Sequence, residues 1–352
     1  MNQHTKYWQI NNIEHDNPAI KEAGQVLRQG GLVAFPTETV YGLGANALNG
    51  PAVEGIFKAK GRPADNPLIV HIATTTAVAQ VANVNNPQAE KLMQAFWPGP
   101  LTLVLPKTNV LPDEVTAGLD TVGVRMPNHP VALALIEAAG VPIAAPSANL
   151  SGSPSPTTAQ HVLDDLTGRI AGVLDGGPAN LGVESTVLDV TTQVPTILRP
   201  GGVTAEQIKA VCGAVCYDPA LDQQPNQNIT PRSPGVKYKH YSPQAPTVLL
   251  EGRQDLILQR LLELFKQYRA QGKQVGILTG AENADKFPGA TVLSYGKGRD
   301  PAAAAAALYA SLRQFDQLGV DVILAEGIPD TGLGRAVMDR LRRAAGGNIQ
   351  HL

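Results

Sequence analysis

The chain has 352 residues, of which 43% are hydrophobic and 16% are charged, and its formal net charge is −2. This length and apolar content predict a globular protein with two domains, because one hydrophobic core rarely serves so many residues. The charge excludes binding of a polyanion by bulk electrostatics. Residues 1–210 hold 12 Lys and Arg against 17 Asp and Glu, so any contact with nucleic acid would be local.

The cysteines and the first residues bear on the compartment. Cys212 and Cys216 have no histidine cluster near them, which predicts reduced thiols and neither a zinc site nor a disulfide framework. The first ten residues, MNQHTKYWQI, are polar and do not resemble a signal peptide. No apolar run approaches the roughly 18 residues that a membrane helix needs. We therefore expect a cytoplasmic protein without membrane contact.

The first 200 residues predict short strands that alternate with helices. Apolar residues at helical spacing predict helices at 17–29, 51–60, 74–84, 87–96 and 131–139. Short apolar runs predict strands at 32–36, 68–72, 97–106, 120–127, 182–190 and 196–201, and one that begins at 141. Residues 37–48 are expected to be a loop in which Gly42 and Gly44 permit unusual backbone angles. This order favours an α/β or α+β domain with its polar residues at strand ends, where sites form in mixed sheets.

Cations occur at two of these strand ends. Lys60 and Arg62 lie in KGRPADNPLIVH, a segment broken by glycine and proline that leads into a predicted strand. A planar arginine fork beside a lysine point charge suits a polyanionic ligand, and ordinary solvated charge is the alternative. Arg125 lies in an otherwise apolar strand, where an unpaired charge is costly. It is expected either to be paired or to point into solvent at the end of the strand.

The segment at 141–157, VPIAAPSANLSGSPSPT, is rich in serine and threonine after its apolar start. Small hydroxyls and backbone amides in such a loop can cradle a phosphate without charge. A plain surface loop has the same composition, so this segment decides nothing alone.

The second half changes character. Residues 217–246 contain six prolines and few aliphatic residues, which predicts a linker. Within it, GVKYKHYSP combines basic and aromatic residues, and it either docks on a neighbouring surface or has a more specific role. From Thr247 strands and helices alternate as in a small parallel three-layer domain. The closing helix, 335–345, carries Arg340, Arg342 and Arg343, for which we expect a solvated basic face.

Six motifs occur in one order along the chain: FPTETVYGLG, KGRPADNPLIVH, TVGVR, APSANLSG, ESTV and LRPG. In this order they resemble the YrdC-type domain, and SPGVKYKHYSP with the domain after it is similar to the long form of the L-threonylcarbamoyl-AMP synthase family. The resemblance covers nearly the whole chain. It implies an α/β fold, with a YrdC-like twisted mixed sheet and helices at 1–216, a linker at 217–246 and a smaller Rossmann-like three-layer domain at 247–352.

The resemblance also implies an enzyme, a nucleotidyltransferase that converts L-threonine, bicarbonate and ATP into threonylcarbamoyl-AMP, pyrophosphate and water. The product would pass to a tRNA threonylcarbamoyl transferase that modifies adenosine 37, and direct contact of this chain with tRNA is left open. ATP is a substrate, Mg²⁺ is carried in with the nucleotide, and no protein metal ligands are expected. Because each substrate carries a negatively charged group, charge neutralisation and alignment are the main requirements.

Carried over position by position, the motifs imply two groups of site residues. The positions at L-threonine are Thr39, His71, Arg125, Ala145 and Ser185. The positions at ATP are Lys60, Arg62, Asn66, Thr121, Ser147, Ser155, Arg199, Tyr238 and Tyr241, with the choice between the two tyrosines left open. Lys60 and Arg62 are expected to be catalytic, by stabilising charge on the triphosphate as pyrophosphate departs.

Two alternatives stand beside this interpretation. A double-stranded RNA binding module without turnover would bind with an affinity that falls steeply with salt, but the acidic balance of residues 1–210 argues against it. Carbamoyl-group enzymes of hydrogenase maturation resemble this chain only over the YrdC-like part. They also carry zinc-finger-like cysteines, which two cysteines cannot supply. The oligomeric state is not predicted.

Overall fold

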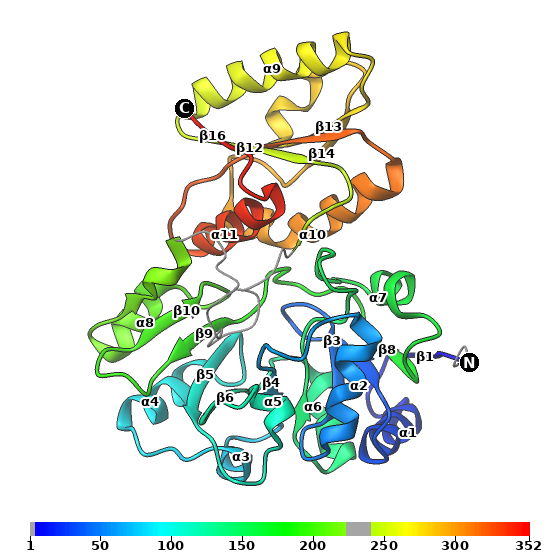
Figure 1. Ribbon diagram of the computed structural model, residues 1–352, viewed down its shortest axis with the longest axis vertical. Helices are drawn as coiled ribbons and strands as arrows, with labels where there is room; N and C mark the ends of the chain where they lie inside the picture. The colour runs from blue at the N-terminus through cyan, green and yellow to red at the C-terminus, as the bar shows by residue number, and fades with distance from the viewer. Residues whose placement is uncertain (1–3, 223–240) are drawn as a thin grey trace. The chain divides into compact units, whose positions relative to one another are not determined.

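The computed structural model describes residues 4–222 and 241–352, which form two compact units (Figure 1). The amino-terminal unit contains the described residues up to 222, except 152–154 and 181–183. These two short segments cluster with residues 241–352 in the carboxyl-terminal unit. The predicted α/β class is confirmed, with a mixed sheet in the first unit and a smaller parallel sheet in the second. No helix in the described ranges has the length and apolarity to cross a membrane.

A mixed sheet forms the centre of the amino-terminal unit, and eleven strands of the described residues belong to it. In spatial order they are β1 (Lys6–Gln9), β8 (Gly172–Asp175), β2 (Val33–Phe35), β3 (Gly42–Asn46), β7 (Ile143–Ala144), β4 (Ile69–His71), β6 (Thr121–Arg125), β5 (Leu101–Pro106), β9 (Thr186–Asp189), β10 (Thr196–Arg199) and β11 (Cys216–Tyr217). Strands β4 and β6 pair in parallel, with His71 opposite Arg125. His71 and Arg125 therefore lie side by side at the carboxyl ends of these two strands.

Helices pack against this sheet and complete its core. They are α1 (Asn17–Arg28), α2 (Gly50–Lys60), α3 (Val78–Val81), α4 (Pro87–Phe96), α5 (Asp113–Thr116), α6 (Pro130–Ala139), α7 (Ala159–Leu166) and α8 (Ala205–Cys212), with the 3-10 turns η1 (Thr75–Ala77) and η2 (Pro219–Asp222). Helix α2 begins where the Asn49 side chain accepts a hydrogen bond from the backbone N–H of Ala52. It ends at Gly61, whose φ of 61° is a left-handed cap that favours glycine. This stop places Lys60 in the last turn and Arg62 just beyond the helix.

The loop predicted at 37–48 is wrong over Gly42–Asn46, which forms β3 and pairs antiparallel with β2. Gly42 and Gly44 weaken the β pattern of the sequence, yet neither has a positive φ. A β-carbon on Gly44 would lie 2.9 Å from Ile143 Cγ2 and 3.0 Å from Phe35 Cε1. The glycine at 44 therefore permits close packing within the sheet and is not there for a turn.

We expect Gly44→Ala to lower the free energy of unfolding by about 1–3 kcal/mol, because the added methyl overfills this contact. Gly42→Ala is the matched control in the same strand. Its new β-carbon would find its nearest neighbours at 3.3 and 3.4 Å, so we expect a smaller loss. Urea unfolding of both variants measures the difference, and equal midpoints would contradict the packing role of Gly44.

The predicted helix at 74–84 is wrong as one continuous helix, because η1 and α3 divide the segment. Several short elements were not predicted at all: β1, β8, β11, α5, α7, α8 and, in the second unit, β16 (Ile349–His351). These elements have eight residues or fewer, too few to show a periodic pattern.

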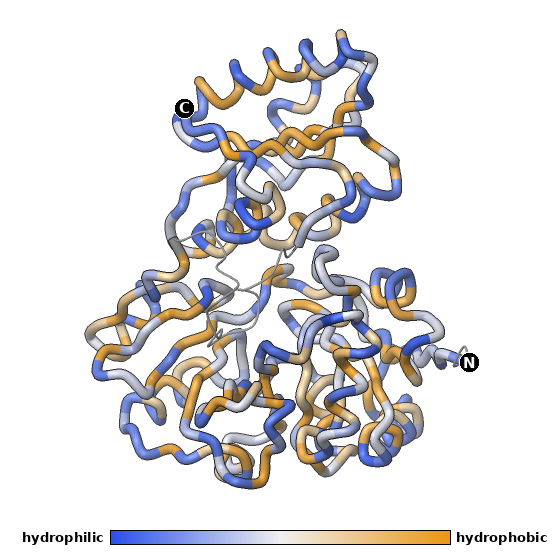
Figure 2. Tube along the Cα trace, viewed as in Figure 1, coloured by the Kyte–Doolittle hydropathy of each residue, from blue (hydrophilic) through white to orange (hydrophobic). Residues whose placement is uncertain are grey.

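The carboxyl-terminal unit is a parallel sheet with helices on both faces (Figure 1). Its strands, in spatial order, are β14 (Thr291–Ser294), β13 (Val275–Thr279), β15 (Val322–Glu326), β12 (Thr247–Glu251) and β16. Helix α9 (Gln254–Ala270) covers one face, α10 (Pro301–Leu318) and α11 (Leu333–Ala345) cover the other, and η3 (Ala281–Lys286) joins β13 to β14. Apolar residues follow the central strands (Figure 2), as expected where a parallel sheet is buried on both sides.

Helix α11 does not present the solvated basic face that the sequence predicted. Arg340 is fully buried, with its guanidinium 5.6 Å from the centroid of the Tyr241 ring and 2.6 Å from the Asp339 carboxylate. Arg342 pairs with Glu251 at 2.8 Å. A charge that has a partner can be buried, whereas an unpaired charge cannot. The basic residues of this helix do not reveal their partners in the sequence, so the prediction of a solvated face is wrong.

Candidate functional site

Residues predicted to bind one ligand meet at the shared edge of β4 and β6. Arg125, at the end of β6, donates through Nη1 to Thr39 Oγ1 at 3.0 Å and through Nε to the Gly99 carbonyl at 3.2 Å. His71 lies opposite it in the strand register, and the backbone N–H of Ala145 donates to the Ile69 carbonyl of β4 at 2.9 Å. The Arg125 side chain is only 4% exposed. The alternative of an arginine pointing into solvent is therefore wrong.

The partner of Arg125 that the sequence reasoning missed is acidic. Glu38 Oε2 lies 2.6 Å from Arg125 Nη2. Glu38 directly precedes Thr39 in FPTETVYGLG, so the only signal in the sequence was its position beside a predicted ligand residue.

His71 is held as a neutral imidazole. Its Nδ1 lies 3.2 Å from the Ile69 carbonyl oxygen, and its ring packs edge-on against Phe35 at 6.0 Å between centroids. Burial, and secondarily the positive charge of Arg125, lowers the pKa of His71 to about 3. The ring therefore adds a hydrogen-bonding group beside Arg125 without adding charge.

The low pKa of His71 predicts a loss of stability in acid. The unfolded chain binds a proton here near pH 6.5 and the folded chain only near pH 3, so the unfolding free energy falls as the pH drops through this window. The limiting slope is roughly 1.4 kcal/mol per pH unit. We expect His71→Gln to flatten the pH dependence of urea unfolding between pH 6 and 4. His15→Gln, whose side chain is 87% exposed, is the control and should keep the wild-type slope. Equal slopes for His71→Gln and wild type would contradict the assignment.

Lys60 fixes the serine-rich loop that follows β7. Its Nζ donates to the carbonyl oxygens of Ser147 at 2.5 Å and Asn149 at 2.6 Å, and lies 3.3 Å from Asn149 Oδ1. Ser147 Oγ in turn donates to Asn149 Oδ1 at 2.5 Å. Asn149 was missed by the sequence reasoning, although it lies two residues after Ser147 in APSANLSG. The lysine thus sets the shape of the loop and places a buried positive charge against it.

A second arginine organises the end of β10. Arg199 donates through Nε and Nη2 to the Ser185 carbonyl at 3.2 and 2.9 Å, and through Nη2 to Ser185 Oγ at 3.2 Å. Ser185 Oγ lies 2.8 Å from Thr102 Oγ1. In the same segment, Ser155 Oγ donates to Glu184 Oε1 at 2.6 Å. The structure therefore brings together three residues that the sequence predicted, and adds Thr102 and Glu184.

The remaining predicted nucleotide residues of this unit lie nearer the start of β6. Arg62 Nη2 donates to the Asn66 carbonyl at 3.5 Å, and its guanidinium lies 5.7 Å from the centroid of the Phe57 ring. Thr121 begins β6 and is about 13 Å along the strand from Arg125. A small, mostly apolar pocket adjoins Thr121, and it is lined by Pro67, Leu68, Ile69, Val104, Leu119, Thr121, Gly123 and Val187. Strand β6 therefore has Arg125 at its carboxyl end and the apolar pocket beside Thr121 at its amino end.

The two predicted tyrosines are not part of this arrangement. Tyr238 lies outside the described residues. Tyr241 is buried in the carboxyl-terminal unit, with its ring 5.3 Å from that of Tyr309 between centroids. A contact of either tyrosine with a nucleotide stays a prediction.

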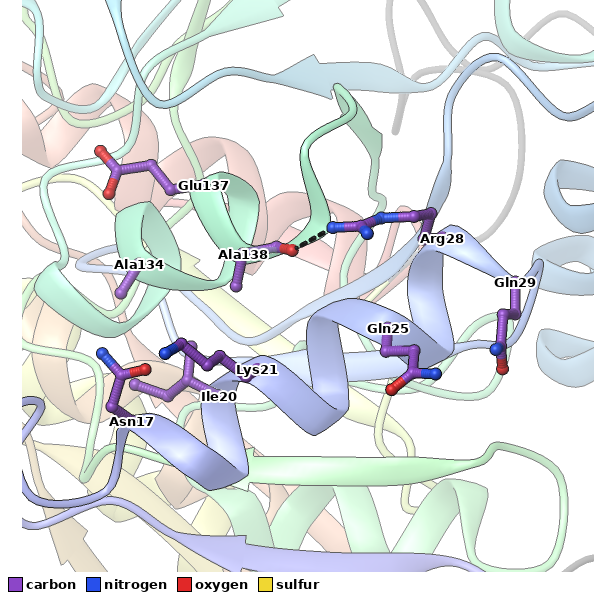
Figure 3. A pocket seen from close by; sticks show the side chains of 9 residues that line it. All are labelled: Asn17, Ile20, Lys21, Gln25, Arg28, Gln29, Ala134, Glu137 and Ala138. Atoms are coloured by element: carbon purple, nitrogen blue, oxygen red, sulfur yellow. Dashed lines mark hydrogen bonds between the residues drawn. The ribbon is translucent and has the colours of Figure 1, made fainter.

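A larger groove, about 640 Å³, lies between α1 and α6 and includes none of the predicted site residues (Figure 3). Its lining is Asn17, Ile20, Lys21, Gln25, Arg28, Gln29, Ala134, Glu137 and Ala138. Arg28 Nη2 donates to the Ala138 carbonyl at 2.7 Å, which ties the two helices together. The groove lacks the converging buried polar groups of a small-molecule site, so we assign the function to the cationic strand ends.

Four cations of the amino-terminal unit are buried: Lys60, Arg62, Arg125 and Arg199. Together with the hydroxyls of Ser147, Ser155 and Ser185 they suit anionic ligands that must be aligned. Within residues 4–222 and 241–352, no group of three or more His, Cys, Asp and Glu could hold a metal ion.

The chain is similar to known proteins over nearly its whole length. Residues 25–201 match the protein family described as Telomere recombination, and residues 203–346 match the threonylcarbamoyl-AMP synthase C-terminal domain. The chain is 51% identical to a threonylcarbamoyl-AMP synthase of Bacillus subtilis, over 98% of this chain and 99% of that one. It is 50% identical to the enzyme of the same name from Pyrococcus abyssi, over 94% and 95% of the two chains. The crystal structure of P. abyssi Sua5 complexed with L-threonine superposes with a TM-score of 0.92 over 99% of both chains, at 46% identity.

Proposed function

Because the chain belongs to the threonylcarbamoyl-AMP synthases of the two-domain Sua5 type, it catalyses the first step of tRNA threonylcarbamoyladenosine modification, and we propose that the buried cations of its amino-terminal unit bind and align the substrates. The enzyme uses ATP. The individual residue roles below are proposals that rest on the contacts just described.

We propose that L-threonine binds at the arginine end of β6. Arg125 offers a planar fork of N–H donors that suits the carboxylate, and Thr39 and neutral His71 add hydrogen-bonding groups beside it. Ser185 and the Ala145 backbone complete the set. The relative from P. abyssi supports L-threonine as the ligand, since its crystal structure is a complex with L-threonine.

We propose that ATP spans the other cations. Lys60 and Arg62 face the triphosphate with the Ser147 loop and Ser155, Arg199 assists them, and the base lies toward Asn66 and the apolar pocket beside Thr121. Mg²⁺ enters on the triphosphate, whose oxygens are the hard ligands that this ion prefers. The ion would supply charge neutralisation there, as the protein cations do.

The reaction needs no covalent intermediate on the protein. The threonine amine attacks the carbon of bicarbonate, forming the N–C bond and releasing water. A carbamate oxygen then attacks the α-phosphorus of ATP, and the bond to pyrophosphate breaks. Alignment by fixed cations and removal of charge repulsion lower the barrier, since both partners of the second step are anions.

The observation that carries the proposal is the burial of two cations that have fixed hydrogen-bond partners. Lys60 donates to the Ser147 carbonyl in the loop after β7, and Arg125 donates to Thr39 Oγ1 from the end of β6. The test measures pyrophosphate release by the full chain with ATP, with and without L-threonine and bicarbonate, and with L-serine as the control substrate. Release that requires both co-substrates is expected. Release independent of threonine would overturn the proposal. So would binding of double-stranded RNA, steeply weakened by salt, without any turnover.

Transfer of the product to a tRNA threonylcarbamoyl transferase, and a cytoplasmic location, are further parts of the proposal. So is the division into domains at 1–216 and 247–352 with a linker at 217–246.

A further inference from the structure

Glu38 is a buried carboxylate whose hydrogen-bonding capacity the described residues leave unfilled. Its Oε2 forms the ion pair with Arg125, yet neither carboxylate oxygen has a hydrogen-bond partner of good geometry within residues 4–222 and 241–352. Both oxygens are shielded from solvent. Since buried carboxylates are ordinarily hydrogen-bonded, Glu38 retains acceptor sites for a ligand that brings donors.

The surroundings of Glu38 supply little positive charge besides Arg125. His129 is its other titratable neighbour, and burial lowers the pKa of His129 although the negative charge of Glu38 opposes this shift. The imidazole is therefore mostly neutral at pH 7. In the described part of the chain, one guanidinium is left to balance the Glu38 carboxylate.

Arg125 keeps capacity for a second carboxylate. A guanidinium has five N–H groups, and Arg125 donates two of them, to the Gly99 carbonyl and to Thr39 Oγ1, while its Nη2 forms the ion pair with Glu38 without a hydrogen bond of good geometry. One N–H on Nη1 and both on Nη2 are left, and a carboxylate can take one from each nitrogen in a fork-to-fork contact. Glu38 and a substrate carboxylate would then share one guanidinium, and the excess negative charge calls for a cation between them.

We propose that Glu38 binds the ammonium group of L-threonine. The Glu38–Arg125 pair then recognises both the ammonium and the carboxylate of a free α-amino acid. This rests on the proposed function, in which Arg125 holds the threonine carboxylate. The ammonium lies within one bond of the carbon that carries that carboxylate, so it falls beside Glu38 when both acids share Arg125. Its three donors match the acceptor sites of Glu38, and its charge restores neutrality. Glu38 thereby selects free amino acids over hydroxy acids of the same shape.

The test measures binding of two probes to the full chain by titration calorimetry. One is L-threonine; the other is (R)-3-hydroxybutanoate, which keeps the carboxylate and hydroxyl but has no ammonium. We expect wild type to prefer threonine, and Glu38→Gln to bind threonine about 10- to 100-fold more weakly while its affinity for the hydroxy acid changes little. Glu54→Gln, an exposed glutamate on α2, is the control and should keep wild-type preference.

Different outcomes separate the possible failures. If Glu38 only holds Arg125 in position, Glu38→Gln weakens both probes by the same factor, and the proposal is wrong. It is also wrong if Glu38→Gln binds threonine as tightly as wild type does. Glu38→Asp, which retains a carboxylate and covers the case that the glutamine variant does not fold, should keep the preference for threonine, and loss of preference there contradicts the proposal. Wild type without threonine-dependent pyrophosphate release would instead overturn the proposed function itself.

Discussion

Replacing Lys60 with methionine should lower kcat/KM for ATP by about a thousand-fold. The buried Nζ does two things that methionine cannot do. It ties the carbonyls of Ser147 and Asn149 into one loop conformation, and it places a fixed positive charge where we propose that the triphosphate binds. Loss of one preorganised electrostatic contact commonly reduces turnover by about 10²–10³, and loss of the loop shape adds to it.

Lys58→Met is the matched control for this experiment. Lys58 lies two residues earlier on the same helix, its side chain is 77% exposed, and it pairs at the surface with Glu54. An exposed pair of this kind contributes about 0–1 kcal/mol, so the variant should keep wild-type stability and activity. Steady-state pyrophosphate release and thermal unfolding are measured on both variants. Similar activity of the two lysine variants would contradict the role of Lys60.

The sequence predicts those parts of the site whose residues lie close together along the chain. Lys60 and Arg62 could be identified because they stand beside a glycine stop and a strand, all within one short segment. Arg125 could be identified because charge in an apolar strand is unusual. Their surroundings could not, because Asn149 is 89 residues from Lys60 and Glu38 is 87 residues from Arg125 along the chain. Only the fold brings such pairs together.

The fold shows the same division. Helices α1, α2, α4 and α6 were predicted within one or two residues because each has ten or more residues and an apolar stripe or a proline start. Strand β3 was missed because its glycines carry no side chain to show a pattern, although the sheet needs their small size at Phe35 and Ile143. Arg340 was assigned to solvent because the helical pattern does not show its tertiary contact with the ring of Tyr241, a residue in the predicted linker. Tertiary contacts decided each of these cases.

Arg125→Met is expected to destabilise the amino-terminal unit by about 3–5 kcal/mol and to abolish threonine-dependent pyrophosphate release. The loss of stability follows from Glu38, because its carboxylate stays buried 2.6 Å from where its counter-charge had been. The loss of activity is expected because the substrate carboxylate then lacks the guanidinium that we propose binds it. One substitution therefore has two effects, and they must be measured separately.

The double variant Arg125→Met/Glu38→Gln separates the two effects of Arg125. Removing the orphaned carboxylate charge should recover most of the lost unfolding free energy, since a neutral amide is far less costly to bury than an ion. It should recover no threonine-dependent activity, because neither charge of the amino acid then has a partner in the site. Urea unfolding and pyrophosphate release are compared for the wild type and the single and double variants. A double variant that regains threonine-dependent turnover would show that Arg125 supports the fold alone, and the threonine carboxylate would then have to bind another of the buried cations.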